Sequence, residues 1–279
     1  MGAGAGNTSS QAMEHAKRCR DEGNERFQRQ KYAAAIESYT EAICHAPKWD
    51  ILYTNRALCH KKRNDWLKVR EDSLKAIELN NEALKAHYLY GVAELELGEG
   101  TRSASEHLSK ALELARERND STKDDIWRNL ARAKHTIWKS EAAVRKRKQD
   151  RLRSRLQRLM QQELSSAAAT DPSAAAEVEE DIATMENMFA RCKKDDEPGD
   201  LPSAYVCRLT MDVFRDPVIT PSGLSYERSV VTEHLHKVGA FDPVTREPVN
   251  ASQLVTNIDL RSATHQYLDD HPWAWAECM

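Results

Sequence analysis

Residues 50–83 read DILYTNRALCHKKRNDWLKVREDSLKAIELNNEA, and this segment contains the pattern that decides the fold. Small residues occupy fixed positions in it, and matching residues stand 34 positions earlier. The matched sets are Gly23, Ala35 and Ala42 in the first copy and Ala57, Val69 and Ala76 in the second. A third copy begins at Leu84 and has Gly91 at the position of Gly23 and Ala57. A 34-residue period predicts helical hairpins that stack as a solenoid.

The small residues have a physical role in such hairpins. Two antiparallel helices approach closely only where the facing side chains are small, and larger residues such as Tyr39 and Leu112 fill the space around them. We expect the repeats at about 16–49, 50–83 and 84–118, within a domain of residues 12–120. The third repeat contains one extra residue, which we expect in the turn at 98–102. Residues 1–11 are expected to form a disordered tail.

The 34-residue pattern resembles the tetratricopeptide repeat, which implies an α-solenoid with a concave groove. Helical spacing places Arg20 with Asn24, Asn55 with Lys62, and Lys85 with Leu89, each pair on one face. Cations and amides gathered in one groove suit a carboxylate ligand. A solvated charged face is the alternative for any of these residues taken alone.

Three short motifs, Gly23-Asn24, Thr54-Asn-Arg-Ala57 and Lys85-Ala-His87, together resemble the carboxylate clamp of chaperone-binding tetratricopeptide domains. The resemblance implies that the groove binds the C-terminal Glu-Glu-Val-Asp of cytosolic heat-shock chaperones of the seventy- and ninety-kilodalton classes. The implied ligands are Arg20, Asn24, Asn55, Lys62 and Lys85, with Phe27 and Tyr88 lining the groove. Arg20 replaces the usual Lys, and Leu89 offers an apolar wall where strong clamps often have Arg.

Residues 121–196 predict a capping helix followed by a helical hairpin. The capping helix spans 124–138 and uses Ile126, Leu130 and Trp138. A basic helix is expected at 141–164, with an apolar seam of Leu152, Leu156 and Leu159. After a break at 165–172, an acidic helix follows with a seam of Val178, Ile182, Met185, Phe189 and Cys192. These matching apolar seams predict an antiparallel, coiled-coil-like hairpin. Because so thin a hairpin cannot bury both sides alone, we expect a homodimer through the hairpin and the following domain.

A different pattern begins after a linker at 197–202. Short apolar runs around Pro221-Ser-Gly223 predict a β-hairpin, residues 228–238 predict a helix, and Asn257 is a good cap for a final helix. The motifs Cys207-Arg-Leu-Thr-Met211, Arg215-Asp-Pro-Val-Ile-Thr-Pro-Ser-Gly223 and Phe241-Asp-Pro-Val-Thr-Arg246 resemble a U-box. The resemblance implies a small α+β domain at 203–272, RING-like without zinc, followed by a tail at 273–279.

The U-box resemblance implies that a ubiquitin-charged conjugating enzyme docks on this domain. Leu209, Met211 and Pro243 would form the apolar docking surface, and Arg246 would steady the ubiquitin tail. His234 is expected at the edge of that surface, with a core or capping role left open. Ser222, Asp242, Thr245 and Arg246 are expected to hold the loops in place of zinc. We expect no metal and no cofactor, because ligand spacing is missing.

Repeats, hairpin and U-box in this order resemble the chaperone-associated U-box ubiquitin ligases. The resemblance implies a mainly α, multidomain ligase that transfers ubiquitin to lysines of chaperone-bound misfolded clients for proteasomal degradation, without a covalent enzyme–ubiquitin intermediate. One alternative makes Cys207 a nucleophile with His234 or His236 as base. The other alternative is a non-enzymatic tetratricopeptide co-chaperone or scaffold.

Charge and composition limit the partners. Lys and Arg total 41 against 44 Asp and Glu, a net charge of −3, which argues against a nucleic-acid partner. No apolar run approaches the roughly 18 residues that span a membrane. Cysteines without C-x-x-C pairs fit a reducing compartment, so we expect the cytoplasm. Arg145-Lys-Arg-Lys148 is either a nuclear import signal or a solvated helix face.

Overall fold

The computed structural model describes residues 5–169, 171–195 and 197–279. The chain divides into two compact units, one ending at Lys134 and the other running from His135 to Cys278. The described elements of the first unit are helices, and the second unit combines helices with one small sheet, as the sequence predicted. None of the helices that the structure describes combines the length and the apolar character needed to cross a lipid bilayer.

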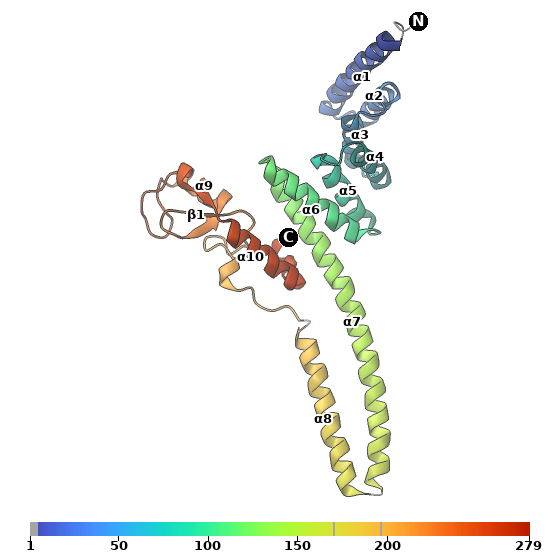
Figure 1. Cartoon of the computed structure of the whole chain (residues 1–279), viewed down its shortest axis with the longest axis vertical. Helices are drawn as coiled ribbons and strands as arrows, with labels where there is room; N and C mark the ends of the chain where they lie inside the picture. Colours follow the sequence, from blue (N-terminus) through green and yellow to red (C-terminus); the bar gives the residue numbers. More distant parts are fainter. Residues whose placement is uncertain (1–4, 170, 196) are drawn as a thin grey trace. The chain divides into compact units, whose positions relative to one another are not determined.

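Six helices of the first unit pair as three consecutive hairpins (Figure 1). They are α1 (Ala5–Gln28), α2 (Tyr32–His45), α3 (Asp50–Lys62), α4 (Trp66–Leu79), α5 (Leu84–Leu97) and α6 (Thr101–Glu117). Each helix packs against the next one along the chain from α1 to α6. This arrangement confirms the α-solenoid predicted from the 34-residue period.

Two boundaries differ from the prediction. Helix α1 begins at Ala5, so the prediction of a disordered tail is wrong for residues 5–11. No proline interrupts the helix in this segment. Residues 1–4 lie outside the described part. The extra residue of the third repeat lengthens α5 to 14 residues, against 13 in α3, and leaves a three-residue turn. Gly98 ends α5 in the left-handed conformation, with φ of 71°.

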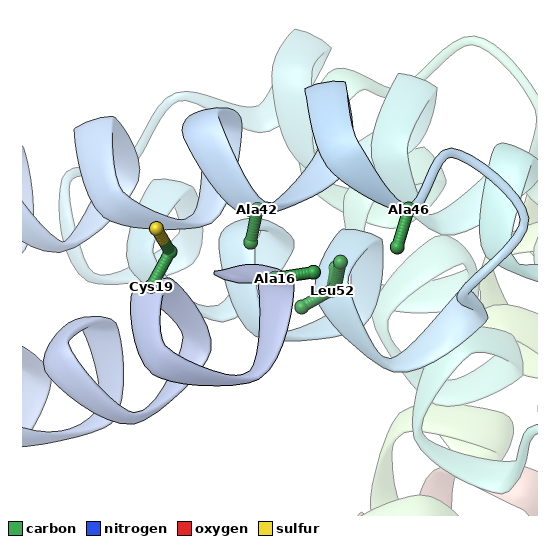
Figure 2. Close-up of a cluster of buried hydrophobic side chains, with 5 residues drawn as sticks. All are labelled: Ala16, Cys19, Ala42, Ala46 and Leu52. Carbon is green, nitrogen blue, oxygen red and sulfur yellow. The ribbon is translucent and has the colours of Figure 1, made fainter. Parts of the chain in front are cut away.

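Close helix contacts explain the small residues of the repeat. Ala16, Cys19, Ala42, Ala46 and Leu52 form a buried cluster among the first helices, in which the sulfur of Cys19 is directed toward α2 (Figure 2). A Cβ atom on Gly23 would lie 2.7 Å from the ring of Tyr39, and one on Gly91 would lie 2.5 Å from Cγ of Leu108. Only glycine therefore permits these two contacts.

The predicted capping helix and basic helix are one element, α7 (Lys123–Ala168), because neither glycine nor proline interrupts the segment. Near its start α7 buries Ile126, Trp127 and Leu130, whereas Trp138, expected to pack there, is half-buried and stacks on His135. Helix α8 (Pro172–Asp195) follows, and Glu186 accepts hydrogen bonds from Arg153 and Gln157 of α7. These contacts join the two helices as a hairpin.

The C-terminal domain contains a three-stranded sheet of order β2-β1-β3. Its elements are η1 (Ser203–Tyr205), β1 (Pro217–Ile219), β2 (Ser225–Glu227), α9 (Arg228–Lys237), η2 (Ala251–Gln253), β3 (Val255–Thr256), α10 (Ile258–Asp270) and η3 (Pro272–Cys278). Val218 pairs with Tyr226 on one side and with Thr256 on the other. The predicted hairpin and helices are confirmed, including the Asn257 cap, whose Oδ1 accepts from Leu260 N at 3.0 Å.

Two features of this domain were not predicted. Strand β3 has only two residues, too short for a periodic signal. The expected tail instead forms η3, in which Trp275 and Cys278 are buried.

The substitution Gly91→Ala tests the close approach of α5 and α6. Glycine to alanine inside a helix ordinarily stabilises by about 1 kcal/mol. Here the new methyl group would overlap Leu108, so we expect a loss of about 1–3 kcal/mol in the free energy of unfolding, measured by urea denaturation followed by circular dichroism. Gly199→Ala, where the nearest atom would lie 3.6 Å away, serves as the control. A stabilised Gly91→Ala chain would contradict the packing described above.

Candidate functional site

Two asparagines link the first two hairpins. Oδ1 of Asn24 on α1 accepts hydrogen bonds from the hydroxyl of Tyr39 at 2.8 Å and from Nδ2 of Asn55 on α3 at 3.3 Å. Asn55 therefore has its carbonyl oxygen and one N–H left for a ligand. Both side chains are half-buried. The structure thus brings together two predicted groove residues that are 31 positions apart in the chain.

Asn55 also lines a pocket of about 430 Å³ formed by α3, α5 and the segment after α6. The predicted Lys85 lies in the same lining, which confirms that these two residues share one concavity. The full lining is Asp50, Ile51, Thr54, Asn55, Asn80, Glu82, Ala83, Leu84, Lys85, Arg118 and Asp120. It contains two cations, Lys85 and Arg118, that could bind a carboxylate.

The sequence did not point to Arg118 and Asp120, because they lie at the end of the repeat domain, outside the motifs that resemble the clamp. Nη2 of Arg118 donates to the carbonyl oxygen of Glu82 at 2.9 Å, which fixes its guanidinium at the pocket. The hydroxyl and the N–H of Thr122 donate to Asp120, and they lower the pKa of this carboxyl group. Asp120 is thus a fixed anion beside the two cations, so the pocket favours a ligand with both acceptors and donors.

The pocket lining, as far as the described residues define it, does not include Arg20 or Lys62. Arg20 lies one helical turn before Asn24, its Nε donates to Asp21 at 2.8 Å, and its guanidinium stacks on Trp49. Lys62 is exposed at the end of α3. Arg20 can still extend the line from Lys85 through Asn55 and Asn24, provided that a ligand carboxylate displaces Asp21.

Leu89 was predicted to form an apolar wall of the groove, and this is wrong. Its side chain is fully buried and packs with Ala57, Val69 and Ala93 in the core between repeats. An aliphatic residue at this position gains more from burial than from facing solvent.

The two aromatic residues that were predicted to line the groove, Phe27 and Tyr88, are half-buried. Phe27 packs against Tyr32 with ring centroids 5.5 Å apart. Tyr88 is covered by Lys61, whose Nζ lies 4.7 Å from the ring centroid and 3.4 Å from the hydroxyl. Burial lowers the pKa of Lys61, a residue that the sequence did not single out.

The second candidate site consists of two loops in the C-terminal domain that share one backbone conformation. In the first loop the N–H of Met211 donates to the carbonyl of Cys207 at 2.8 Å, and Cys207 N donates to Asp212 O. In the second the N–H of Arg246 donates to the carbonyl of Asp242 at 3.0 Å, and Asp242 N donates to Glu247 O. Isolated bridges close the two loops, Val206 with Val213 and Phe241 with Pro248.

Met211 and Arg246 occupy the same position in the two loops. Their φ angles are 62° and 64°, in the left-handed region that residues with a Cβ atom seldom adopt. Such conformations cost of order 1 kcal/mol or more and persist where the surrounding structure holds them. The hydrogen bonds within each loop thus fix where these two exposed side chains point.

The carboxylate of Asp242 organises the second loop. It is fully buried and accepts from the hydroxyls of Thr220, Ser222 and Tyr226 at 2.7–2.9 Å, and from the N–H groups of Val244 and Thr245 at 2.9 and 3.0 Å. Burial acts to raise the pKa of Asp242, but these hydrogen bonds outweigh it and hold the pKa well below its usual range. The side chains of Ser222 and Asp242 therefore hold the loop, whereas Thr245 contributes its backbone N–H and the Arg246 side chain lies over Phe241.

Glu227 organises the first loop in a comparable way. Its carboxylate accepts from the backbone N–H groups of Arg215 and Asp216 at 2.9 and 3.1 Å, and burial raises its pKa. The backbone N–H of Glu227 contacts Sγ of the fully buried Cys207 at 3.4 Å. The sequence did not identify Glu227, because its role depends on a loop 11 residues distant.

Between these anchors the loops present apolar side chains to solvent. Met211 is 70 % exposed, Leu209 38 % and Val244 53 %, while Pro243 is half-buried. Val244 joins the predicted surface as an addition, since it holds the position in the second loop that Leu209 holds in the first. Exposed apolar side chains at matched positions of two loops suit an interaction surface.

Arg246 and His234 surround Phe241. The guanidinium of Arg246 lies 5.0 Å from the ring centroid of Phe241 and its head is exposed. Nε2 of His234 lies 3.1 Å from the carbonyl oxygen of Phe241, and since a carbonyl only accepts, Nε2 carries the hydrogen. This hydrogen bond ties α9 to the second loop, and the place of His234 at the edge of the docking surface stays a prediction.

The chain is similar to several known proteins. Residues 201–273 match the U-box domain family. The E3 ubiquitin-protein ligase CHIP of Arabidopsis thaliana is 38 % identical over 266 residues, which cover 93 % of this chain and 95 % of that protein. Solved structures include the TPR2B domain of yeast Sti1 in its complex with the Hsp70 peptide, 30 % identical, covering 43 % of this chain and 96 % of that one, with a TM-score of 0.41. The first TPR of Spaghetti (RPAP3) bound to the Hsp90 peptide SRMEEVD is 27 % identical, with coverages of 43 % and 94 % and a TM-score of 0.40.

Asp242→Asn tests the buried carboxylate. The amide leaves at least one buried donor without its charged acceptor, so the domain should lose about 1.5–3 kcal/mol of stability at neutral pH, measured by urea denaturation. Because the pKa of Asp242 is depressed by folding, its contribution is present above the unfolded pKa of about 4 and is lost as pH falls below it. The variant should therefore lose less stability than the parent between pH 5 and 2.

Asp212→Asn is the matched control, since this exposed residue of the first loop uses its carbonyl rather than its carboxylate in the fold. Equal acid sensitivity in the parent and the Asp242→Asn chain would refute the role assigned to Asp242.

Proposed function

Since the chain belongs to the family of the E3 ubiquitin-protein ligase CHIP, we propose that it joins a bound chaperone to a ubiquitin-charged conjugating enzyme. The chain is a U-box ubiquitin ligase, and U-box proteins act as RING-like ubiquitin transferases. Its repeats would bind the chaperone peptide, and its U-box would bind the enzyme. The observation that carries the proposal is the pair of matched loops with exposed Leu209, Met211 and Val244.

The loops supply docking and orientation rather than a nucleophile. Cys207 is fully buried in the core with Phe214 and Val218, so its thiol cannot reach a thioester, and the alternative of a covalent intermediate on Cys207 lacks support. The apolar loop residues would bind the conjugating enzyme. Arg246, held over Phe241, would donate hydrogen bonds to the ubiquitin tail and restrict the thioester to reactive orientations.

The pocket of the repeats would bind the C-terminal Glu-Glu-Val-Asp of a heat-shock chaperone. Lys85 and Arg118 supply charge for the terminal and side-chain carboxylates, and Asn55 supplies an amide for the backbone. Asn24 and Arg20 would extend the site along α1. Misfolded clients held by the chaperone would then be the substrates, in the cytoplasm.

Two variants separate these activities in a reconstituted reaction with activating enzyme, conjugating enzyme, ubiquitin and a heat-shock chaperone. Lys85→Ala removes one charged donor, so binding of the Glu-Glu-Val-Asp peptide should weaken about ten- to a hundredfold while self-modification continues. Met211→Lys places a charge in the docking surface, so all ubiquitin transfer should fall while peptide binding is unchanged.

Matched controls are Lys75→Ala, a paired lysine on α4, and Ile258→Lys, an exposed apolar residue at the start of α10. Both should behave as the parent chain. If Met211→Lys transferred ubiquitin normally, the docking surface would be wrong. If no conjugating enzyme supported transfer while the chaperone bound, a non-enzymatic co-chaperone would be the better description.

We further propose that the chain forms a homodimer, with the α7–α8 hairpin contributing the contact. Met185 of α8 is buried and Leu156 of α7 is half-buried in the hairpin, whereas Leu152 and Leu159 are each 52 % exposed. These two residues are seven positions apart, so they lie on one face of α7. A second copy could cover this face by coiled-coil packing.

Leu152→Glu should convert a dimer into a monomer, measured as a halved mass by light scattering after size exclusion. The charge would have to be buried in the contact, which disfavours association. Leu67→Glu on α4, at an equally exposed leucine, is the control and should leave the mass unchanged. A Leu152→Glu chain of unchanged dimeric mass would exclude this face of α7.

A further inference from the structure

A cluster of metal-ligand residues lies between α1 and α2, apart from the residues assigned to the peptide. His15 and Cys19 are one turn apart on α1, and Glu41 and His45 are one turn apart on α2. Because residues at i and i+4 share a helical face, each helix presents its pair on one side. The two helices pack closely around Ala16 and Ala42, which brings the pairs together.

The distances in this cluster suit one small cation. Nε2 of His15 lies 3.6 Å from Oε1 of Glu41, and the rings of His15 and His45 are 4.3 Å apart between centroids. One ligand atom from each of His15, Glu41 and His45 falls within 4.8 Å of the other two. With zinc–ligand bonds of about 2.0–2.2 Å, ligand atoms around one zinc ion lie roughly 3.3 Å apart, so small side-chain rotations complete the geometry.

Two surrounding features support a cation here. Sγ of Cys19 lies 3.5 Å from Nδ1 of His15, so the buried cysteine holds the second ring nitrogen while Nε2 faces Glu41. A hydrogen-bond partner on the far nitrogen is the usual way in which a metal-binding histidine is oriented. In addition, α2 ends at His45, and the C-terminal end of a helix favours positive charge.

We propose that His15, Glu41 and His45 bind a divalent transition metal, best matched by zinc, that links α1 to α2. Two imidazoles and one carboxylate, with a fourth position left for water, form a donor set that zinc accepts. Cys19 acts as the positioning residue behind His15. The alternative for the same residues is an ion pair between a protonated His15 and Glu41, without a metal.

The sequence contains no paired cysteines and led us to expect no metal, whereas this site takes one ligand from α1, His15, and two from α2, Glu41 and His45. The metal would hold α1 against α2 through His15, in the turn of α1 that precedes Arg20. It would therefore stiffen the hairpin that carries Arg20 and Asn24.

Zinc titration of the full chain by calorimetry, after treatment with a chelator, tests the proposal. We expect one site per chain, weakened at least about tenfold in His15→Ala, His45→Ala and Glu41→Gln. These side chains are half-buried or exposed, so the variants should fold, which circular dichroism checks without metal. Zinc should also raise the melting temperature of the parent chain more than that of the variants, because it binds only the folded site.

Controls of the same residue types are His236→Ala, exposed on α9, and Glu37→Gln, exposed on α2 one turn before Glu41. Both should bind zinc as the parent does. Equal zinc affinity and stoichiometry in the parent, His15→Ala and His45→Ala would overturn the proposal. So would a parent chain that binds no zinc, which would leave an ion pair only.

Discussion

The buried carboxylate of Asp242 is the interaction on which the U-box depends. A domain of about seventy residues has a small hydrophobic core, and comparable modules rely on metal ions for their loops. Five donors converge on Asp242 from the β1–β2 turn, from β2 and from its own loop. A charge without partners would cost several kcal/mol in this position. Because all five donors bind the carboxylate, Asp242 fixes three segments of the chain at one point.

The equivalence of the two loops shows how such an anchor produces a docking surface. Cys207 and Asp242 stand at the same position and make the same backbone hydrogen bonds, yet one contributes a thiol to the core and the other a carboxylate. Four positions after Cys207 and Asp242, both loops have a residue in the left-handed backbone conformation, Met211 in the first and Arg246 in the second. The fold thus holds one apolar and one cationic side chain in matched, exposed positions.

Periodic features were predictable from the sequence, and contacts across the chain were not. The 34-residue period placed the hairpins, whereas the resemblance to the carboxylate clamp pointed to Asn24, Asn55 and Lys85, of which Asn55 and Lys85 line one pocket. The prediction that Leu89 faces the groove was wrong, because a residue's position in the repeat does not say how much of its side chain the next hairpin covers. Glu227 and Arg118 escaped notice because each acts on a segment outside its own motif.

The hairpin of α1 and α2 shows why one helix can serve two purposes. Its inner packing uses Ala16, Ala42 and Gly23, residues too small to carry any chemistry, and so the polar residues are confined to the remaining faces of α1. Asn24 lies on the face toward Asn55, whereas His15 and Cys19 lie on the face toward Glu41 and His45. Both faces are rigid because the same close helix contact supports them. Any ligand that strengthens this contact from the second face therefore also fixes the position of Asn24 on the first.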